Sequence, residues 1–281
     1  MTTTLQNGSF SEELFSNESA RRNESFEYET DSDDTKFQSY IVGGKYARIQ
    51  DFPHSAFLVI KCHKVEYEEF TCGSSILNQL ILLTAAHCFE DCRSGSKVLV
   101  SVGNRRKTKG NFYTVGKFAS HGEYDGHVMK NDIAVAILSR PLVFGSSVKR
   151  VLLSHIGIYK EPALVAGWGI TNEKLYTPTL YLKWTRQVVL SRRRCLRLVP
   201  NLNNGYFCAT GDVKHETDYG YAAVGDSGSA LIVRRSIQIG IVSYKIPKTS
   251  KSLIIYTNVT KYHHWITSAS KQLYCHQFKF T

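Results

Sequence analysis

The sequence predicts an all-β protein with a helix near its carboxyl end and a disordered amino-terminal segment. Beyond residue 40 the chain consists of short apolar runs separated by turn residues, a pattern typical of a β-sandwich or β-barrel. Patterns with helical periodicity are rare in this part of the chain. The first forty residues differ in kind, because they are acidic, polar and free of cysteine. These three observations define the predicted fold class and divide the chain after residue 40.

The segment 1–40 contains nine acidic and three basic residues, so its net charge is −6. Residues 41–281 carry +17 and all seven cysteines, within a total of +11 for the chain. The acidic segment has few large apolar residues and no apolar periodicity, which indicates disorder. A length of 281 residues suggests about two domains, but β-barrel folds of roughly 200–250 residues often form one. We therefore expect one domain over 41–281.

Eight runs rich in Ile, Val, Leu and Tyr are too short for helices and predict strands. They lie at residues 56–60, 75–84, 97–102, 133–138, 163–166, 230–233, 237–243 and 253–259. Residues 261–272 predict a helix, because four apolar residues fall on one helical face. These are Tyr262, Trp265, Ile266 and Ala269. No window approaches about 18 consecutive apolar residues, so we expect no transmembrane helix.

Sequons for asparagine-linked glycosylation occur three times in the acidic segment, at Asn7, Asn17 and Asn23, and once near the end, at Asn258. Three sequons within forty residues favour a secreted glycoprotein. A signal peptide is not evident, because residues 1–20 lack a basic start and an apolar stretch of about 7–15 residues. Export by another route, a start beyond this sequence and no export at all stay open.

Four short motifs combine residues that are suited to chemistry. They are Ile41-Val42-Gly43-Gly44, Leu83-Thr84-Ala85-Ala86-His87-Cys88, Asn131-Asp132-Ile133-Ala134-Val135 and Gly225-Asp226-Ser227-Gly228-Ser229-Ala230-Leu231. His87 and Asp132 are 45 residues apart, and Asp132 and Ser227 are 95 apart. In this order and spacing the motifs resemble those of the chymotrypsin-like (trypsin family) serine proteases, over roughly residues 41–270. The resemblance implies two packed six-stranded antiparallel β-barrels with a carboxyl-terminal helix.

The chemistry of three residues accounts for the motifs. A serine hydroxyl is a poor nucleophile at neutral pH, and histidine titrates near neutrality and can take its proton. A carboxylate on the far imidazole nitrogen fixes the tautomer and stabilises the imidazolium. The resemblance therefore implies Ser227 as nucleophile, His87 as base and Asp132 as orienting acid. It implies an oxyanion hole at the backbone N–H groups of Gly225 and Ser227.

The resemblance also implies a zymogen, with residues 1–40 as its prosegment. In the family, a cut before the position of Ile41 frees an α-amine, which pairs in the interior with the acid before the nucleophile, here Asp226. The residue before the cut is usually Arg or Lys, but here it is Tyr40. We expect an activating protease that cuts after Tyr40, or trimming from a nearby site. The alternative is that Ile41 begins a buried strand and the chain is never cut.

The cysteines indicate disulfides and therefore an oxidising compartment. The resemblance implies two pairs, and the neighbouring loops of the first barrel suggest a third. In that order the pairs are Cys72–Cys88, Cys195–Cys208 and Cys62–Cys92. Cys275 is left over, and we expect it to be free or to pair with another chain. Metal binding is the alternative, but no Cys-x₂-Cys pair supports it, and residues 102–122, where some family members bind calcium, contain no Asp or Glu. We expect no metal and no cofactor.

The resemblance implies a narrow substrate pocket. Its residues are Tyr221, Ser243, Tyr244, Lys245 and Ile254. Tyr221 occupies the floor position, where trypsin-like specificity needs Asp, and Lys245 and Ile254 replace glycines of the wall. Asp218 could serve as the acid only after a local shift. Cleavage after Arg or Lys is disfavoured because no acid is placed to pair the charge, and cleavage after Phe or Trp is disfavoured by volume. A shallow site for small residues, an unusual pocket and no productive binding stay open.

These features predict a secreted, monomeric serine endopeptidase that acts on protein or peptide substrates through an acyl-serine intermediate. The alternative is a regulatory or binding protein that keeps the protease fold with little or no activity. Basic clusters at 105–109, 192–194, 234–235 and 245–251 are interpreted as solvated loops or as a surface for an anionic glycan. Nucleic acid is disfavoured as a partner, because the clusters lack interleaved aromatic residues for stacking.

Overall fold

The computed structural model describes residues 42, 44–62, 69–90, 92, 95–157, 161–212 and 220–278. All of them belong to one compact unit, Ser39–Thr281. The acidic segment 1–40, with its three sequons, lies outside the described residues, as do Ile41 and Asp218. The sections below therefore concern the body of the chain.

The first half of the body forms a closed six-stranded antiparallel barrel with the strand order β2-β3-β4-β7-β6-β5. Its strands are β2 (Ser55–Lys61), β3 (Glu69–Ile76), β4 (Ile81–Thr84), β5 (Lys97–Val102), β6 (Asn111–Ser120) and β7 (Ala134–Leu138). The central strand β2 places Leu58 opposite Cys72 on β3 and opposite Val100 on β5, and all three are buried. Burial of such apolar side chains stabilises the barrel by roughly 1.5–3 kcal/mol for each large residue.

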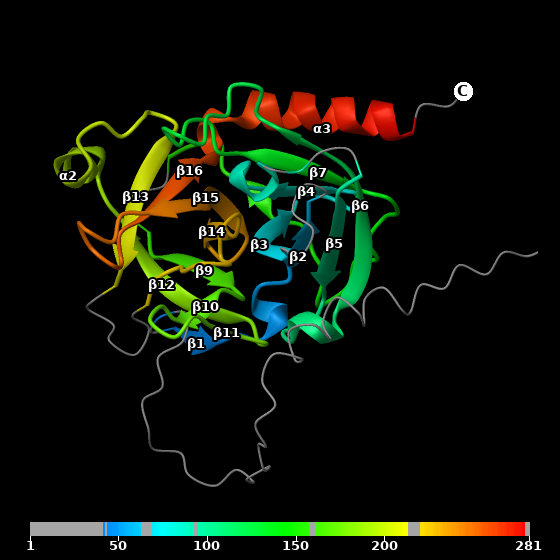
Figure 1. The fold of residues 1–281 in the computed structure, drawn as a ribbon, viewed down its shortest axis with the longest axis horizontal. Coiled ribbons are helices and arrows are strands. Elements are labelled where there is room, and N and C mark those ends of the chain that lie inside the picture. Colours follow the sequence, from blue (N-terminus) through cyan, green and yellow to red (C-terminus); the bar gives the residue numbers. More distant parts are fainter. Residues whose placement is uncertain are drawn as a thin grey trace, which may run out of the picture. The chain divides into compact units, whose positions relative to one another are not determined.

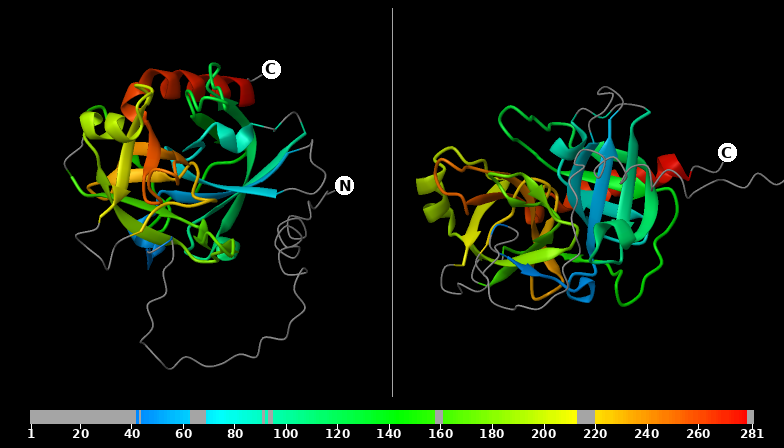
Figure 2. Two further views of the ribbon diagram at one scale, coloured as in Figure 1. Left: turned by 60° about the vertical axis from the view of Figure 1, so that its left-hand side comes forward. Right: turned by 60° about the horizontal axis from the view of Figure 1, so that its bottom comes forward.

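The second half forms a barrel of six strands, β9-β12-β13-β16-β15-β14, which closes because β14 pairs with β9. Its strands are β9 (Ala163–Gly167), β12 (Lys183–Val189), β13 (Tyr206–Gly211), β14 (Ala230–Val233), β15 (Ile237–Lys245) and β16 (Ile254–Asn258). Two short strands, β1 (Lys45–Tyr46) and β8 (Leu152–Leu153), pair with β12 and β15 from outside the ring. The predicted fold of two six-stranded antiparallel barrels is thus confirmed, and the two barrels lie side by side in Figures 1 and 2.

The remaining elements are short, except for the last helix. They are the hairpin β10 (Ile170–Asn172) and β11 (Thr177–Pro178), the helices α2 (Arg192–Leu198) and α3 (His263–Gln277), and the 3-10 turns η1 (Ile49–Asp51), η2 (His87–Phe89), η3 (Lys107–Lys109) and η5 (Val259–Lys261). Helix α3 lies along the first barrel (Figure 1), and its buried residues Ile266, Ala269 and Leu273 join the core of that barrel. The predicted helix at 261–272 is therefore confirmed with later bounds. Within the described residues, no helix is both long enough and apolar enough to cross a bilayer.

One strand prediction is wrong. Residues 75–84 were expected to form a single strand, but a turn separates the end of β3 from β4. The side-chain oxygen of Asn78 accepts hydrogen bonds from the N–H groups of Leu80 and Ile81, each at 2.8 Å. An asparagine that binds the backbone in this way favours a turn over a strand. The barrel strands β6, β12 and β13 and the short strands β1, β8, β10 and β11 were not predicted.

Candidate active site

Antiparallel pairing in the first barrel brings His87 and Asp132 to one edge. Strand β4 pairs with β7, and Thr84 stands opposite Ala134 at that edge. His87 follows β4 in the turn η2, and Asp132 precedes β7 by two residues. Nδ1 of His87 lies 2.8 Å from Oδ2 of Asp132, and the backbone N–H of His87 donates to Oδ1 of the same carboxylate at 2.9 Å. Forty-five residues of chain thus close into the histidine–carboxylate pair that the motifs predict.

The Asp132 carboxylate is completely buried but strongly hydrogen-bonded. The backbone N–H of Asp132 donates to the hydroxyl of Tyr206 at 2.9 Å, and the backbone carbonyl of Asp132 accepts from the hydroxyl of Thr257 at 2.7 Å. The hydroxyl of Ser243 donates to Oδ2 of the carboxylate itself. Burial opposes ionisation, but the hydrogen bonds from His87 and Ser243 outweigh it and lower the pKa of Asp132. Tyr206 and Thr257 were not singled out from the sequence, and Ser243 was assigned to the pocket. They come from the second barrel, 74 to 125 residues away, so no local motif could have indicated them.

The surroundings of His87 shift its pKa in opposite directions. Desolvation lowers its pKa, while the hydrogen bond and the charge of Asp132, together with the charge of Glu90, raise it, and the net shift is upward. A hydrogen bond from Nδ1–H to Asp132 leaves Nε2 as the proton acceptor of the neutral ring. The imidazole is therefore held in the tautomer that a general base needs.

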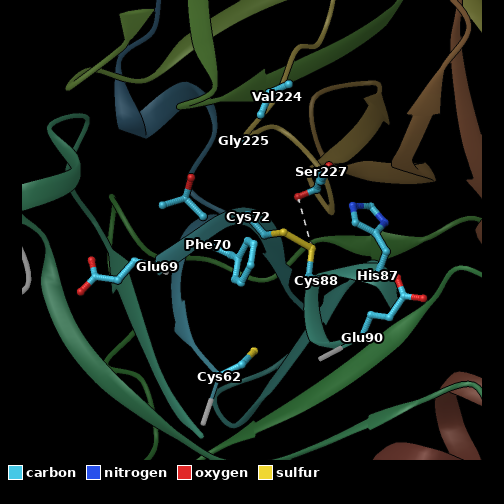
Figure 3. Close-up of a pocket in the computed structure, with 11 residues that line it drawn as sticks. Cys62, Glu69, Phe70, Cys72, His87, Cys88, Glu90, Val224, Gly225 and Ser227 are labelled. Carbon is cyan, nitrogen blue, oxygen red and sulfur yellow. Dashed lines mark hydrogen bonds between the residues drawn. A yellow bond between two sulfur atoms is a disulfide. The ribbon is translucent and has the colours of Figure 1, made fainter. Parts of the chain in front are cut away.

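Ser227 lies in the loop before β14, in the second barrel, and shares a cavity of about 430 Å³ with His87. Figure 3 shows the two side chains next to each other at one side of this cavity. The carbonyl of Ser227 accepts a hydrogen bond from the N–H of Gly73 on β3 at 2.7 Å, which ties the loop to the first barrel. Ser227, the nucleophile that the resemblance implies, thus lies at the same cavity as His87, which pairs with Asp132.

The loop backbone around Ser227 leaves two donors unused. Gly225 and Gly228 have φ values of 91° and 83°, which favour glycine, and a Cβ on Gly225 would lie 3.0 Å from Gly169. Within the described part of the chain, the N–H groups of Gly225 and Ser227 make no hydrogen bond, whereas Asp226, Gly228 and Ser229 all donate theirs. Two free N–H groups beside Ser227 are compatible with the oxyanion hole that the resemblance implies.

Asp226 lies in the interior, 1% exposed. Its carboxylate accepts hydrogen bonds from the N–H groups of Gly169, at 2.8 Å, and Ala223, at 2.9 Å. Burial raises its pKa to about 6, against the pull of these two donors. The expected partner, the amine of Ile41, lies outside the described residues, but the next residue, Val42, already pairs with Tyr221, whose N–H donates to the Val42 carbonyl at 3.2 Å.

Of the residues predicted to form the substrate pocket, Lys245 at the end of β15 stands opposite Ile254 at the start of β16. Tyr221 and Ile254 are buried in the core of the second barrel, and Tyr244 and Lys245 are half-buried. Nζ of Lys245 lies 5.6 Å from the centre of the Tyr221 ring and forms an ion pair with Glu173. Glu173 follows β10 and was missed by the sequence reasoning, because nothing in its neighbourhood indicates a pocket.

Three disulfides join Cys62 to Cys92, Cys72 to Cys88 and Cys195 to Cys208, and Cys275 is free and exposed. The sulfur atoms of Cys72 and Cys88 lie within 4.8 Å of a ring nitrogen of His87. They are bonded to each other and so offer no thiolate to a metal.

Several basic residues of the predicted anion-binding clusters are engaged within the fold. Lys107 is 3% exposed, with Nζ 5.0 Å from the centre of the Phe57 ring. The guanidinium of Arg192 donates to three backbone carbonyls, and Arg234 pairs with Glu161. The clusters are therefore not uniformly solvated.

Comparison with known proteins agrees with this geometry. The Trypsin family matches residues 41–266, a range that contains His87, Asp132 and Ser227. The chain is 29% identical over 238 residues to chymotrypsin from Phaedon cochleariae, which covers 82% of each protein. It is 31% identical over 238 residues to hypodermin-B from Hypoderma lineatum, which covers 82% of this chain and 88% of the relative.

Among solved structures, the fold is similar to that of an inactivated protease paralogue of the scabies mite, S-D1, with a TM-score of 0.71 and 23% identity. The match covers 82% of this chain and 97% of that one. The matched range spans both barrels and the cavity between His87 and Ser227. The chain therefore belongs to the trypsin family of chymotrypsin-like serine proteases.

Proposed function

We propose that this protein is a serine endopeptidase that hydrolyses peptide bonds through an acyl-serine intermediate. The observation that supports this most strongly is the 2.8 Å contact between His87 Nδ1 and the buried Asp132 carboxylate, next to Ser227. A carboxylate held in this way stabilises the imidazolium that forms when the histidine takes a proton.

In the proposed reaction Ser227 Oγ attacks the carbonyl carbon of the scissile bond, and its proton passes to Nε2 of His87. The N–H groups of Gly225 and Ser227 bind the oxyanion that forms. His87 then gives the proton to the leaving nitrogen, the carbon–nitrogen bond breaks, and the acyl ester on Ser227 remains. Water deprotonated by His87 attacks this ester, releases the acid and restores the serine.

We also propose that the protein is a secreted zymogen. A cut after Tyr40 by a second protease would free the amine of Ile41, which would pair with Asp226. The burial of Asp226 with two backbone donors supports this, because a buried carboxylate is stabilised by a positive partner. The three disulfides favour an oxidising compartment.

The narrowed acyl-side pocket is part of the same proposal. Tyr221 at its floor and the Lys245–Glu173 ion pair at its wall subtract volume and place a cation where a basic substrate side chain would enter. Small acyl-side residues are therefore preferred, and cleavage after Arg or Lys is disfavoured because the carboxylate at the wall, Glu173, already pairs with Lys245.

The same ion pair favours a second candidate, a binding or regulatory protein without turnover, because it obstructs the pocket. A fluorophosphonate probe separates the two after a cut that exposes Ile41. Labelling that is lost in the Ser227→Ala variant supports the protease. A cut chain that stays unlabelled, with Ile41 verified as its new terminus, supports the regulatory protein.

A further inference from the structure

The open cavity at the nucleophile is not the pocket that the family resemblance implies. It is lined by residues of β3, of η2 and of the loop before Ser227, among them Glu69, Phe70, Glu90 and Val224. None of Tyr221, Ser243, Tyr244, Lys245 and Ile254 lines it. The open cavity of about 430 Å³ at Ser227 and the site narrowed by the Lys245–Glu173 ion pair are therefore lined by different residues.

The direction of a bound substrate decides which half of the peptide enters this cavity. A peptide departs from the scissile bond in two directions, and the proposed function assigns its acyl half to the Tyr221–Lys245 pocket. The leaving nitrogen takes its proton from His87, and His87 lines the open cavity. The leaving-group half of the peptide is therefore the part that reaches it.

The lining suits a long cationic side chain. Phe70 is 38% exposed and offers an apolar face (Figure 3), along which the methylene stem of Lys or Arg can lie. In that view the Phe70 ring lies between Glu69 and Glu90. Glu69 stands opposite Lys61 in the β2–β3 register, so its charge is partly balanced.

Glu90 is the stronger candidate for recognition. It is exposed, and within the described part of the chain its carboxylate has one partner, the hydroxyl of Tyr124 at 3.1 Å. The negative charge of Glu90 raises the pKa of His87, so Glu90 lies close enough to act on the residue beside the reacting atoms. A carboxylate at this place attracts a cation that follows the scissile bond.

We infer that the protein selects substrates by a Lys or Arg at the first or second residue of the leaving group, with Glu90 as the specificity-determining residue. This rests on the proposed function. The substrate side chain that determines specificity thus binds in the open cavity on the leaving-group side and not in the narrowed acyl-side pocket.

The test uses peptides with one fixed acyl half and Lys, Ala or Glu at the first two leaving positions, cleaved by the full chain after the activating cut. Because exposed ion pairs contribute about 0.2–1 kcal/mol, the Lys peptide should exceed the Ala peptide about 1.4- to 5-fold in kcat/KM. Glu90→Gln should bring that ratio to about 1, and Glu90→Lys should make the Glu peptide the better substrate. Glu161→Gln, which removes a carboxylate paired with Arg234 outside the cavity, is the matched control and should keep the ratio.

Two further measurements separate this inference from the proposed function. A small acyl ester without a leaving peptide reports on the triad alone, so failure to hydrolyse it counts against the protease. The Ser227→Ala chain binds peptides without turnover, so fluorescence anisotropy with the same Lys and Ala peptides tests the preference even in that event. Equal cleavage and equal binding of the two peptides would overturn the inference.

Discussion

The hydroxyl of Ser243 donates a hydrogen bond to Oδ2 of Asp132, the same carboxylate oxygen that Nδ1 of His87 contacts at 2.8 Å. Two groups 111 and 45 residues away from Asp132 thus stabilise one buried charge. Burial would otherwise keep this carboxylate protonated, and a protonated acid cannot stabilise an imidazolium. Strand β15, which carries Ser243 in the second barrel, therefore helps to hold the carboxylate that contacts His87 in the first barrel.

Replacement of Ser243 by alanine should lower kcat about 10- to 150-fold, because a hydrogen bond to a charged group contributes roughly 1.5–3 kcal/mol. The pKa of Asp132 should rise, since one of the groups that lower it is removed. Steady-state kinetics on the cut enzyme measures the effect. Ser243→Thr, which keeps a hydroxyl, should recover part of the activity, whereas equal losses in both variants would show that the hydroxyl is not responsible.

The pH profile should follow His87. Its pKa lies above the usual 6.5, since the hydrogen bond and charge of Asp132 outweigh desolvation. Because a base must be neutral, kcat/KM should rise with pH and reach half its plateau above pH 6.5. A midpoint below that of free histidine would contradict the assignment of His87 as the base.

Asp132→Asn should lose about 10⁴-fold in kcat, as expected when the amide favours the wrong tautomer of His87.

The fold was readable from the sequence wherever the pattern of apolar residues matches burial. Strands β5 and β14 have the predicted bounds, since their apolar runs are bounded by turn residues. Strand β12 escaped prediction because its inward positions are polar: Lys183, Thr185 and Gln187 are at most 1% exposed. Gln187 is accommodated by donating to the carbonyl of Gly220 at 2.9 Å, a contact 33 residues distant.

The candidate site likewise contains features that could be predicted from local sequence and contacts that could not. The motifs around His87, Asp132 and Ser227 are local and could be read directly, whereas the partners of Asp132 depend on how the barrels pack. Glu173 illustrates this most clearly, because its ion pair with Lys245 joins the ends of strands β10 and β15. Such a contact has no sequence signature.

Opening the acyl-side pocket should broaden specificity. Lys245→Gly removes the side chain that pairs with Glu173 and overlies Tyr221, so cleavage after Phe or Leu should increase about 10-fold, the gain from burying roughly two methylene groups. Profiling with a peptide library that varies only the residue before the scissile bond measures this. Lys251→Gly, at an exposed loop position, is the control. An unchanged profile in Lys245→Gly would mean that this side chain does not limit entry.

Asn258 should carry no glycan in the folded protein. It ends strand β16, is 5% exposed, and its side-chain oxygen accepts from the N–H and hydroxyl of Thr260 at 3.2 and 2.8 Å. A glycan on this amide would displace buried structure. Mass spectrometry of protein secreted from eukaryotic cells should find the Asn258 peptide unmodified. Asn258→Ala should destabilise the fold by about 1 kcal/mol through loss of the cap on η5.

In the uncut chain, Asp226 should make stability depend on pH in an unusual direction. Its folded pKa of about 6 lies above the unfolded value of 3.8, so between these values the folded state binds more protons. The free energy of unfolding should therefore fall as pH rises from 3.8 to 6, by about 3 kcal/mol at roughly 1.4 kcal/mol per pH unit.

Urea unfolding of the uncut chain at pH 4 and pH 7 measures this difference, and Asp226→Asn should remove it because the amide does not ionise. Asp125→Asn, at an exposed turn, should leave it in place. A cut after Tyr40 should also remove it, since the amine of Ile41 would pair with the carboxylate and favour its charged form. If the cut chain and the uncut chain lose equal stability between pH 4 and pH 7, the amine does not reach Asp226, and the proposed activation switch is wrong.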